Sequence, residues 1–306
     1  MPRPLRLGLA GAGRWGRNYM RTIAALPELR LARVASANVE TPDLMPPGCE
    51  VVDHWQKLLE PAAIDGLIIA TPPASHAEIA RSAIDVGIAV LVEKPLALSA
   101  DDARTVRDLA MQKRVPVLVD HTHLFSPAFR ALKDLVACHG GAREIRSEAS
   151  NHGPYRRDVS VLWDWGPHDV AMCLDLMRQA PASAVCSVIE SSHRGDGKAE
   201  TVSVALSFPS GVPAEIRLSN TRDKARRFLV RCADGAHVLY DDTSAQKLRI
   251  DSSPIAVDVQ PPLTVAVREF AAAIASGGTD QSGLDLAVRV VEVLQACNPI
   301  RQGALE

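Results

Sequence analysis

A glycine loop near the N-terminus constrains the fold of this chain more than any other feature. Gly11, Gly13 and Gly16 follow the apolar segment 5–10 (LRLGLA), and residues 14–25 have a helical pattern. The spacing Gly-x-Gly-x-x-Gly between a strand and a helix is typical of a turn that holds a dinucleotide pyrophosphate. The N–H groups at the helix start then bind the anion. A glycine-rich turn without a ligand is the alternative. The predicted dinucleotide-binding residues of this loop are Gly11, Gly13, Arg14, Trp15 and Gly16.

Strands and helices alternate through residues 1–120, which we predict to be a dinucleotide-binding domain. The predicted strands are 5–10, 29–36, 50–53, 66–70, 88–92 and 115–119, and the predicted helices are 14–25, 55–59, 74–86 and 100–113, the last with Ser99 as its N-cap. Such alternation predicts a parallel sheet covered on both faces. The expected fold is α/β, a Rossmann doubly wound sheet with its ligand at the carboxyl ends of the strands.

Residues 121–306 have a different pattern. Extended segments separated by short turns predict an open, mainly antiparallel sheet. The expected strands are 184–190, 201–208, 214–218, 228–232 and 237–240, and the expected helices are 127–137, 167–178, 264–275 and 283–296. We interpret this half as an α+β domain for substrate binding and oligomerisation, whose last helices are able to pack back on the first domain.

Composition excludes several classes of protein. The 306 residues include 34 Lys+Arg and 36 Asp+Glu, a net charge of −2, which gives no reason to expect nucleic acid or an anionic membrane surface as partner. No apolar run reaches membrane-spanning length, and the N-terminus is unlike a secretory signal. Six scattered cysteines without Cys-x-x-Cys spacing favour free thiols in a reducing cytoplasm.

The end of the second predicted strand bears on the choice of cofactor. A carboxylate about 20 residues past the glycines binds the ribose hydroxyls of NAD. This chain has Ser36 in that region, and its first acid afterwards is Glu40. A small hydroxyl residue leaves room for a 2′-phosphate, to which Arg14 and Arg33 could supply charge. The pattern therefore predicts NAD(P), with a preference for NADP.

Three further motifs follow the glycine loop in one order. They are 70–76 (ATPPASH), 93–96 (EKPL) and 163–169 (WDWGPHD). Together with the loop, the two-domain plan and the length, they resemble the Gfo/Idh/MocA oxidoreductase family over nearly the whole chain. Segment 121–127 (HTHLFSP) also looks like members that act on nucleotide-linked or free sugars.

The resemblance implies an enzyme that moves a hydride between nicotinamide and a carbinol carbon, usually of a sugar or cyclitol. It also implies dimers or tetramers formed through the second sheet. On the same basis the cofactor is expected to be bordered by Thr71, Pro72, His76, Glu93 and Lys94.

Lys94 directly follows a predicted buried strand, where a doubly wound sheet places its ligands. Pro95 restricts the backbone of the residue before it and so directs Lys94. We predict that Lys94 orients the substrate hydroxyl and shares or relays its proton, with Glu93 as structural support. An ordinary surface lysine is the alternative.

Asp164 and His168 are four residues apart, so one helical turn would place them on the same face. Histidine suits a general base that takes the hydroxyl proton as hydride leaves. Asp164 would orient the substrate or stabilise the imidazolium. Because Gly166 and Pro167 are typical of a helix entry, the alternative is an Asp164 cap with His168 as a bystander.

Other polar residues are weaker candidates. His121 and His123 alternate on a strand-like segment, but two histidines without a third ligand do not predict a metal, and a substrate-pocket or core role is expected instead. Tyr155 and Arg156 lie in a loop that could bind a sugar hydroxyl or phosphate, or simply be solvated. The charge run 222–227 is expected to form an exposed face.

The leading hypothesis is an NAD(P)-dependent sugar or cyclitol oxidoreductase with His168, Lys94 and Asp164 as its catalytic residues. A glycoside hydrolase that keeps NAD bound is a second possibility, distinguished by the absence of net cofactor consumption. A non-catalytic cofactor-sensing regulator is a third, which the presence of Lys94 and His168 disfavours.

Overall fold

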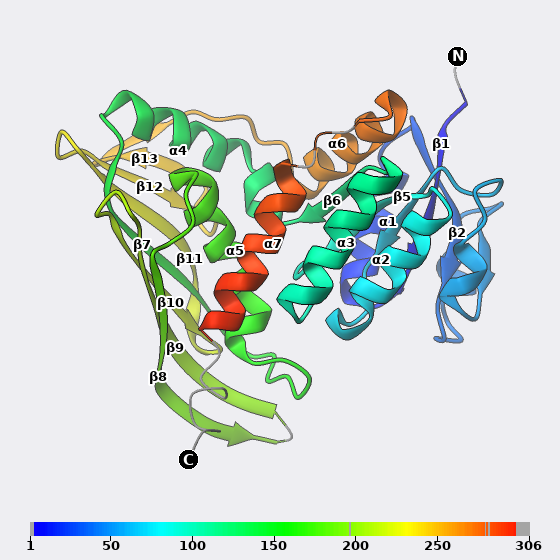
Figure 1. Cartoon of the computed structure of the whole chain (residues 1–306), viewed down its shortest axis with the longest axis horizontal. Helices are drawn as coiled ribbons and strands as arrows, with labels where there is room; N and C mark the ends of the chain where they lie inside the picture. The colour runs from blue at the N-terminus through cyan, green and yellow to red at the C-terminus, as the bar shows by residue number, and fades with distance from the viewer. Residues whose placement is uncertain (1–2, 196, 279, 281, 298–306) are drawn as a thin grey trace. The chain divides into compact units, whose positions relative to one another are not determined.

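The chain divides into two compact units in a computed structural model that describes residues 3–195, 197–278, 280 and 282–297. The first unit comprises the residues up to 120 together with 263–291 (Figure 1). The second comprises 121–262 and the residues from 292 onward. Each unit has its own sheet.

The first unit contains a six-stranded sheet in which every strand pair is parallel, as predicted. Its spatial order is β3-β2-β1-β4-β5-β6, so the order reverses between β1 and β4. The strands are β1 (Leu5–Ala10), β2 (Leu29–Ala35), β3 (Glu50–Val52), β4 (Gly66–Ile69), β5 (Ala89–Glu93) and β6 (Val117–Asp120). This is the predicted doubly wound Rossmann sheet, whose ligands bind where the order reverses.

Helices cover the first sheet. They are α1 (Arg14–Ala24), α2 (His76–Asp85), α3 (Ala100–Lys113) and α6 (Pro262–Ser276). Helix α7 (Ser282–Ala296) belongs to the first unit up to residue 291 and to the second unit beyond it. The main core cluster joins Leu9 of β1, Ile68 of β4, Ile23 of α1 and Phe270 of α6. Ser99 caps α3 as predicted, since its hydroxyl accepts a hydrogen bond from the Asp102 N–H at 3.1 Å.

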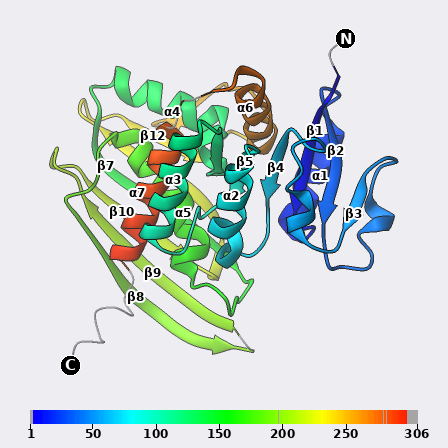
Figure 2. The ribbon, with the colours of Figure 1, turned by 45° about the vertical axis from the view of Figure 1, so that its right-hand side comes forward.

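The second unit contains an eight-stranded sheet of order β14-β13-β12-β11-β7-β10-β9-β8 (Figure 2). Its pairs are antiparallel except for β7 and β10, which are parallel. The strands are β7 (Ala142–His152), β8 (Ser183–Arg194), β9 (Gly197–Ser207), β10 (Pro213–Ser219), β11 (Thr221–Cys232), β12 (His237–Asp241), β13 (Leu248–Ile250) and β14 (Ser253–Ile255). The expected open, mainly antiparallel sheet is confirmed.

Strand β7 was not predicted, although this strand lies inside the sheet between β10 and β11. Its buried face carries Ile145 and Ala149 with a serine between them, Ser147, which hides the apolar alternation. The Ser147 hydroxyl lies within hydrogen-bond distance of both the Asp169 carboxylate and the Arg227 carbonyl. Tertiary contacts of this polar residue, rather than local pattern, place it in the core. The short strands β13 and β14 were also not predicted.

Two helices pack on one face of the second sheet. They are α4 (Pro127–Cys138) and α5 (Val161–Met177). The Phe129 ring of α4 meets the Phe228 ring of β11 edge to face, with centroids 5.6 Å apart. Asp169 of α5 reaches β7 through Ser147.

The predicted start of α5 at Pro167 is wrong. The helix begins at Val161, and Pro167 lies inside it. Glu200 of β9 explains the earlier start, because its carboxylate accepts the Val161 N–H at 3.2 Å and so satisfies an orphan donor of the first turn. Such a cap comes from a residue far away in the chain and leaves no local signal.

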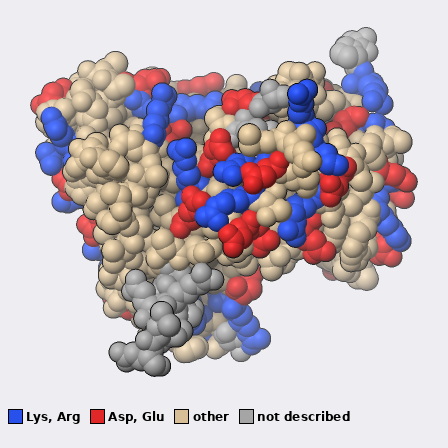
Figure 3. Space-filling view, in the orientation of Figure 1, with Lys and Arg blue, Asp and Glu red and all other residues tan. Residues whose placement is uncertain are grey.

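Charged side chains are interspersed on the face shown in Figure 3. On α3, Arg104 pairs with Asp101 and Arg107 pairs with Asp108. This mixing agrees with the net charge of −2. Among the described residues, no helix is both long and apolar enough to traverse a bilayer.

Candidate active site

The glycine loop lies at the carboxyl end of β1, beside the ends of β2 and β4. The Gly11 N–H donates to the Ala35 carbonyl at 3.0 Å, and the Ala70 N–H donates to the Ala10 carbonyl at 2.8 Å. Gly11 has a φ of +96°, and a Cβ there would lie 2.8 Å from the Ala70 carbonyl oxygen. A Cβ on Gly16 would collide with the Gly11 carbonyl oxygen. The first and third glycines are therefore required by close backbone packing.

Gly13 is different, and its surroundings fit a dinucleotide. A Cβ at this position would meet no protein atom within 4 Å, so its surface is open. Gly13 is the N-cap of α1, and neither a side-chain cap nor an acidic residue occupies the first turn. Free N–H groups at an uncapped helix start suit a pyrophosphate. Arg14 and Trp15, in the same turn, are exposed.

Ser36 follows β2, as predicted. Its hydroxyl lies 2.8 Å from the Thr41 hydroxyl and accepts the Asn38 N–H at 3.1 Å. Arg33 does not extend toward this position: its guanidinium is held by the carboxylates of Glu50 and Glu60. The charge that Arg33 could supply to a 2′-phosphate is thus already paired with these two carboxylates.

His76 ties together two loops that follow neighbouring strands. Its Nε2 lies 2.8 Å from the Thr71 carbonyl, after β4, and its Nδ1 lies 2.8 Å from the Pro95 carbonyl, after β5. Burial lowers the pKa of this imidazole. Both ring nitrogens thus lie against backbone carbonyls, and His76 links the loop after β4 to the loop after β5. The Thr71 hydroxyl is likewise engaged, 2.7 Å from that of Ser75, and Pro72 lies in the same turn.

Lys94 stands directly after β5, at the carboxyl edge of the sheet, and is 9% exposed. The Lys94–Pro95 peptide bond is cis. Glu93, the last residue of β5, is buried beside it. Two residues that sequence analysis did not single out surround Glu93, namely Tyr19 of α1 and Asp120 of β6. Tyr19 lies on the predicted helix 14–25, and Asp120 directly follows the predicted strand 115–119.

Asp164 and His168 both lie on α5, one helical turn apart, as their spacing required. Asp164 accepts a hydrogen bond from Arg156 at 3.2 Å, and Arg156 also binds Asp158. Ser160, not Asp164, is the N-cap of α5, so the capping alternative for Asp164 is wrong. His168 is buried in the second unit.

His123 meets His168 edge to face, with ring centroids 5.2 Å apart. The other side of its ring is held by Tyr240 of β12, whose hydroxyl lies 2.9 Å from Nδ1. Burial, together with the charges of Arg226 and Lys247 and against the opposing charge of Asp242, lowers the pKa of His123 to about 4. His123 is therefore neutral near pH 7 and does not oppose a proton on His168 by charge. Tyr240 was not foreseen as a member of this site.

The segment that carries His121 and His123 is not strand-like as expected. Strand β6 ends at Asp120, and a 3-10 helix follows at Thr122–Phe125. His121 precedes that turn and is buried. In the described ranges, no three His, Cys, Asp or Glu side chains come together as a metal-binding group.

The remaining predicted residues lie in a loop beside β9. The Tyr155 carbonyl packs so closely on Gly197 that a Cβ there would collide with it. Arg156 accepts the Lys198 N–H at its carbonyl. Of the charge run 222–227, Arg226 departs from the expected exposed face. Its guanidinium lies 4.7 Å from the Trp165 ring centroid.

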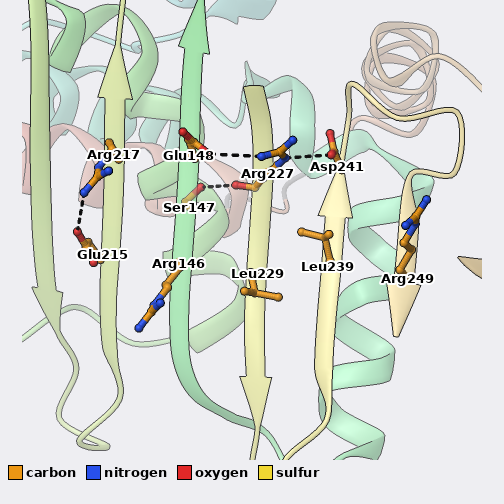
Figure 4. Close-up of a pocket in the computed structure, with 10 residues that line it drawn as sticks. All are labelled: Arg146, Ser147, Glu148, Glu215, Arg217, Arg227, Leu229, Leu239, Asp241 and Arg249. Carbon is orange, nitrogen blue, oxygen red and sulfur yellow. Dashed lines mark hydrogen bonds and ion pairs between the residues drawn. The ribbon is translucent and has the colours of Figure 1, made fainter. Parts of the chain in front are cut away.

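The opposite face of the second sheet has no helix among the described residues and bears a shallow hollow (Figure 4). Rows of charged side chains cross it, with Arg227 paired to Glu148 and to Asp241. Leu229 and Leu239 lie between the charges. None of the predicted catalytic or cofactor residues lines this hollow.

Comparison with known proteins agrees with this organisation. The family model described as "Oxidoreductase family, NAD-binding Rossmann fold" matches residues 5–121, and the "GFO/IDH/MocA C-terminal domain" model matches 131–238. The inositol 2-dehydrogenase of Rhizobium meliloti is 30% identical over 71% of this chain and 69% of its own length. The UDP-N-acetylglucosamine 3-dehydrogenase of Acidithiobacillus ferrooxidans is 26% identical over 74% of this chain and 71% of its own.

A crystal structure of a Magnetospirillum magnetotacticum MS-1 protein superimposes with a TM-score of 0.91 at 45% identity, covering 96% of this chain and all of that one. The fold and these matches define an oxidoreductase with an NAD-binding Rossmann unit. The chain belongs to the Gfo/Idh/MocA family.

Proposed function

We propose that this protein transfers a hydride between NAD(P) and a carbinol or carbonyl carbon of a sugar, nucleotide-sugar or cyclitol. The observation that carries the proposal is the placement of Lys94 at the carboxyl edge of the Rossmann sheet, in a chain that also presents Asp164 and His168 one turn apart on α5. Relatives named for inositol and UDP-N-acetylglucosamine dehydrogenation support the substrate class.

The bound nicotinamide supplies hydride transfer. On the protein side, His168 takes the hydroxyl proton during oxidation and returns it during reduction. Lys94 donates a hydrogen bond to the same oxygen, which polarises it and steadies its developing negative charge. Asp164 orients the substrate and stabilises the imidazolium. The neutral His123 packed on His168 keeps that proton uptake free of like-charge repulsion.

The decisive experiment measures turnover of Lys94→Ala and His168→Ala with a panel of inositols, nucleotide-sugars and aldoses. Loss of a positioned proton-transfer group should lower kcat by about 10²- to 10⁴-fold. Cofactor binding, followed by nucleotide fluorescence, should change little in His168→Ala. Lys113→Ala and His139→Ala are matched controls, since both residues form surface ion pairs in other regions. Near-normal turnover in both site variants would refute the proposal.

The preference for NADP over NAD is part of the proposal. Ser36 in place of a carboxylate and the exposed Arg14 support it. Structures of fold neighbours contain NAD in one case and NADP in another, so the fold does not choose between them. Titration with both cofactors tests the preference, and clearly tighter NAD binding would overturn it.

Assembly and location complete the proposal. The face of the second sheet that no described helix covers, with its acidic and basic side chains, supports a homodimer or homotetramer through that sheet. Sedimentation of the pure protein tests this, and a monomer at micromolar concentration would overturn it. Six free cysteines support a reducing, cytoplasmic location.

A further inference from the structure

Three ionisable side chains meet in the interior of the first unit, next to Lys94. The Tyr19 hydroxyl lies 3.0 Å from Glu93 Oε1 and 2.6 Å from Asp120 Oδ2. All three residues are at most 5% exposed. They come from α1, β5 and β6, and Glu93 and Asp120 are direct neighbours in the register of the two parallel strands.

Counting protons limits the ionisation of this cluster. A phenol has one proton, so Tyr19 can donate to only one of the two carboxyl groups. If both carboxyls were ionised, the other contact would place two acceptor oxygens against each other in a buried site. One carboxyl must therefore be the neutral acid and donate its own proton to the Tyr19 oxygen.

The two distances indicate which carboxyl holds the proton. A hydroxyl that donates to a carboxylate gives a contact of about 2.5–2.7 Å, shorter than one between neutral groups. The 2.6 Å contact marks Asp120 as the carboxylate that receives the Tyr19 proton. The longer 3.0 Å contact marks Glu93 as the acid.

Electrostatics give the same assignment. Burial, followed by the negative charge of Asp120, raises the pKa of Glu93 to about 8, against the smaller opposing effects of the Lys94 charge and of the hydrogen bonds from Tyr19 and the Lys94 backbone. The same burial and the two carboxyls raise the pKa of Tyr19 well above its ordinary value, so it remains a donor. The groups around Glu93 are thus Tyr19 from α1, Asp120 from β6 and Lys94 after β5, while His76 from α2 faces Lys94.

We propose that Glu93 is held as the neutral acid and Asp120 as the carboxylate, bridged by the Tyr19 hydroxyl, and that this set places a single negative charge at the strand end that carries Lys94. Glu93 and Asp120 are positioning residues, because they act through Lys94. The ionisation pattern is independent of the proposed function, on which only the role assigned to Lys94 rests.

The direct test is infrared spectroscopy of the carboxyl C=O stretch at a pH of about 6, between the ordinary value for Glu and the raised value for Glu93. The wild type should show the band of a buried carboxylic acid. Glu93→Gln should lose it, while Asp120→Asn should keep it. Asp169→Asn is the control, because burial also raises the pKa of Asp169, in the second unit. A band lost in Asp120→Asn but kept in Glu93→Gln, or lost in neither, would overturn the assignment.

The pH profile of kcat/KM tests the link to Lys94. Asp120→Asn removes the single negative charge and disfavours a neighbouring ammonium, so the profile should move to lower pH by about one unit. Glu93→Gln replaces a neutral acid by a neutral amide, so the profile should stay in place whatever rate remains. An equal shift of the pH profile in Glu93→Gln and Asp120→Asn, or no shift in Asp120→Asn, would refute the positioning role.

The melting temperature measured as a function of pH tests the ionisation of Glu93 without any substrate. A buried acid with a raised pKa makes the fold lose stability as the pH rises from about 4.5 to about 8. Glu93→Gln should therefore gain stability relative to the wild type across that window. A constant difference would contradict a neutral Glu93. If Lys94→Ala and His168→Ala were both fully active, the proposed function would fail while this result and the infrared result could still hold.

Discussion

The two units bury polar side chains in different ways. In the first, Tyr19, Glu93 and Asp120 share hydrogen bonds around one hydroxyl, and both carboxyls end adjacent parallel strands. In the second, His123 and His168 meet with Tyr240 from three segments with no common register. A parallel sheet gathers polar residues at one predictable edge, because each follows a strand. In a mixed sheet, polar residues come together only through the particular order and pairing of its strands.

Replacing a helical glycine in each unit should sharpen this contrast, and Gly16→Ala has the largest expected effect. Its Cβ would collide with backbone, the Gly11 carbonyl, which cannot move without opening the strand-to-helix turn. We expect a loss of about 3 kcal/mol in stability and cofactor binding weakened by more than about tenfold. Calorimetric melting and cofactor titration measure both.

Gly13→Ala is the matched control within the same loop. Its Cβ would meet no protein atom within 4 Å, so the melting temperature should stay near that of the wild type. Only cofactor binding should weaken, since the backbone there is expected to approach the pyrophosphate. Equal melting losses in Gly13→Ala and Gly16→Ala would contradict the division of roles between these glycines.

The Asp65→Asn substitution tests a partnered carboxylate of the first unit. Asp65 binds the Arg6 guanidinium at 2.7 Å and the Arg6 N–H at 2.8 Å. The Arg6 hydrogen bonds hold the pKa of Asp65 below its ordinary value. We expect a loss of about 1.5–3 kcal/mol near pH 7. Because a lowered pKa stabilises the fold only while the carboxyl is ionised, the loss should shrink as the pH falls below the ordinary aspartate value and vanish only below the lowered pKa of Asp65.

Asp169→Asn in the second unit should respond to pH in the opposite sense. Burial raises the pKa of Asp169, so the wild-type fold loses stability as the pH rises above the ordinary aspartate value. The asparagine variant lacks that loss and should gain relative stability with rising pH. Melting curves across the acid range compare the two variants, and parallel slopes would show that the two carboxyls are not buried differently.

Gly166→Ala, inside α5, has the smallest expected effect. Its Cβ would approach Leu294 Cδ2 at 3.1 Å and Leu218 Cδ1 at 3.3 Å, both ends of flexible side chains. The crowding opposes a gain in helix propensity of about 1 kcal/mol. The net change should be within about 1 kcal/mol by calorimetric melting. A loss as large as that of Gly16→Ala would show that packing around α5 is as rigid as the glycine loop.

The first unit could be predicted from sequence almost element by element. Apolar runs such as 66–70 end at glycines or prolines, and the loop after β1 has fixed spacing. The second unit was predicted in class but not in detail. Strand β7 carries inward Ser147, and α5 starts where Glu200 caps it from another strand. Both features depend on partners distant in the chain, which local pattern cannot report.

The candidate site likewise contains residues that the sequence predicted and residues that it did not. Lys94 follows a strand and His168 stands at helical spacing from Asp164, so motif and spacing found them. Tyr19 and Asp120 were missed because a buried tyrosine on α1 and an acid ending β6 look ordinary until the parallel register brings them to Glu93. Tyr240 was missed because β12 is more than a hundred residues from His123.

Helix α6 has a consequence for how the chain is made. Its Val267 and Phe270 belong to the core cluster of the first unit, and Phe270 packs on Gly66 of β4. Residues 121–262, the larger part of the second unit, leave the ribosome before this helix does. During synthesis, the apolar residues of the Rossmann sheet that α6 covers therefore stay exposed until residues 121–262 and then α6 have been made. A chaperone that binds the nascent chain would protect this apolar surface until α6 is made.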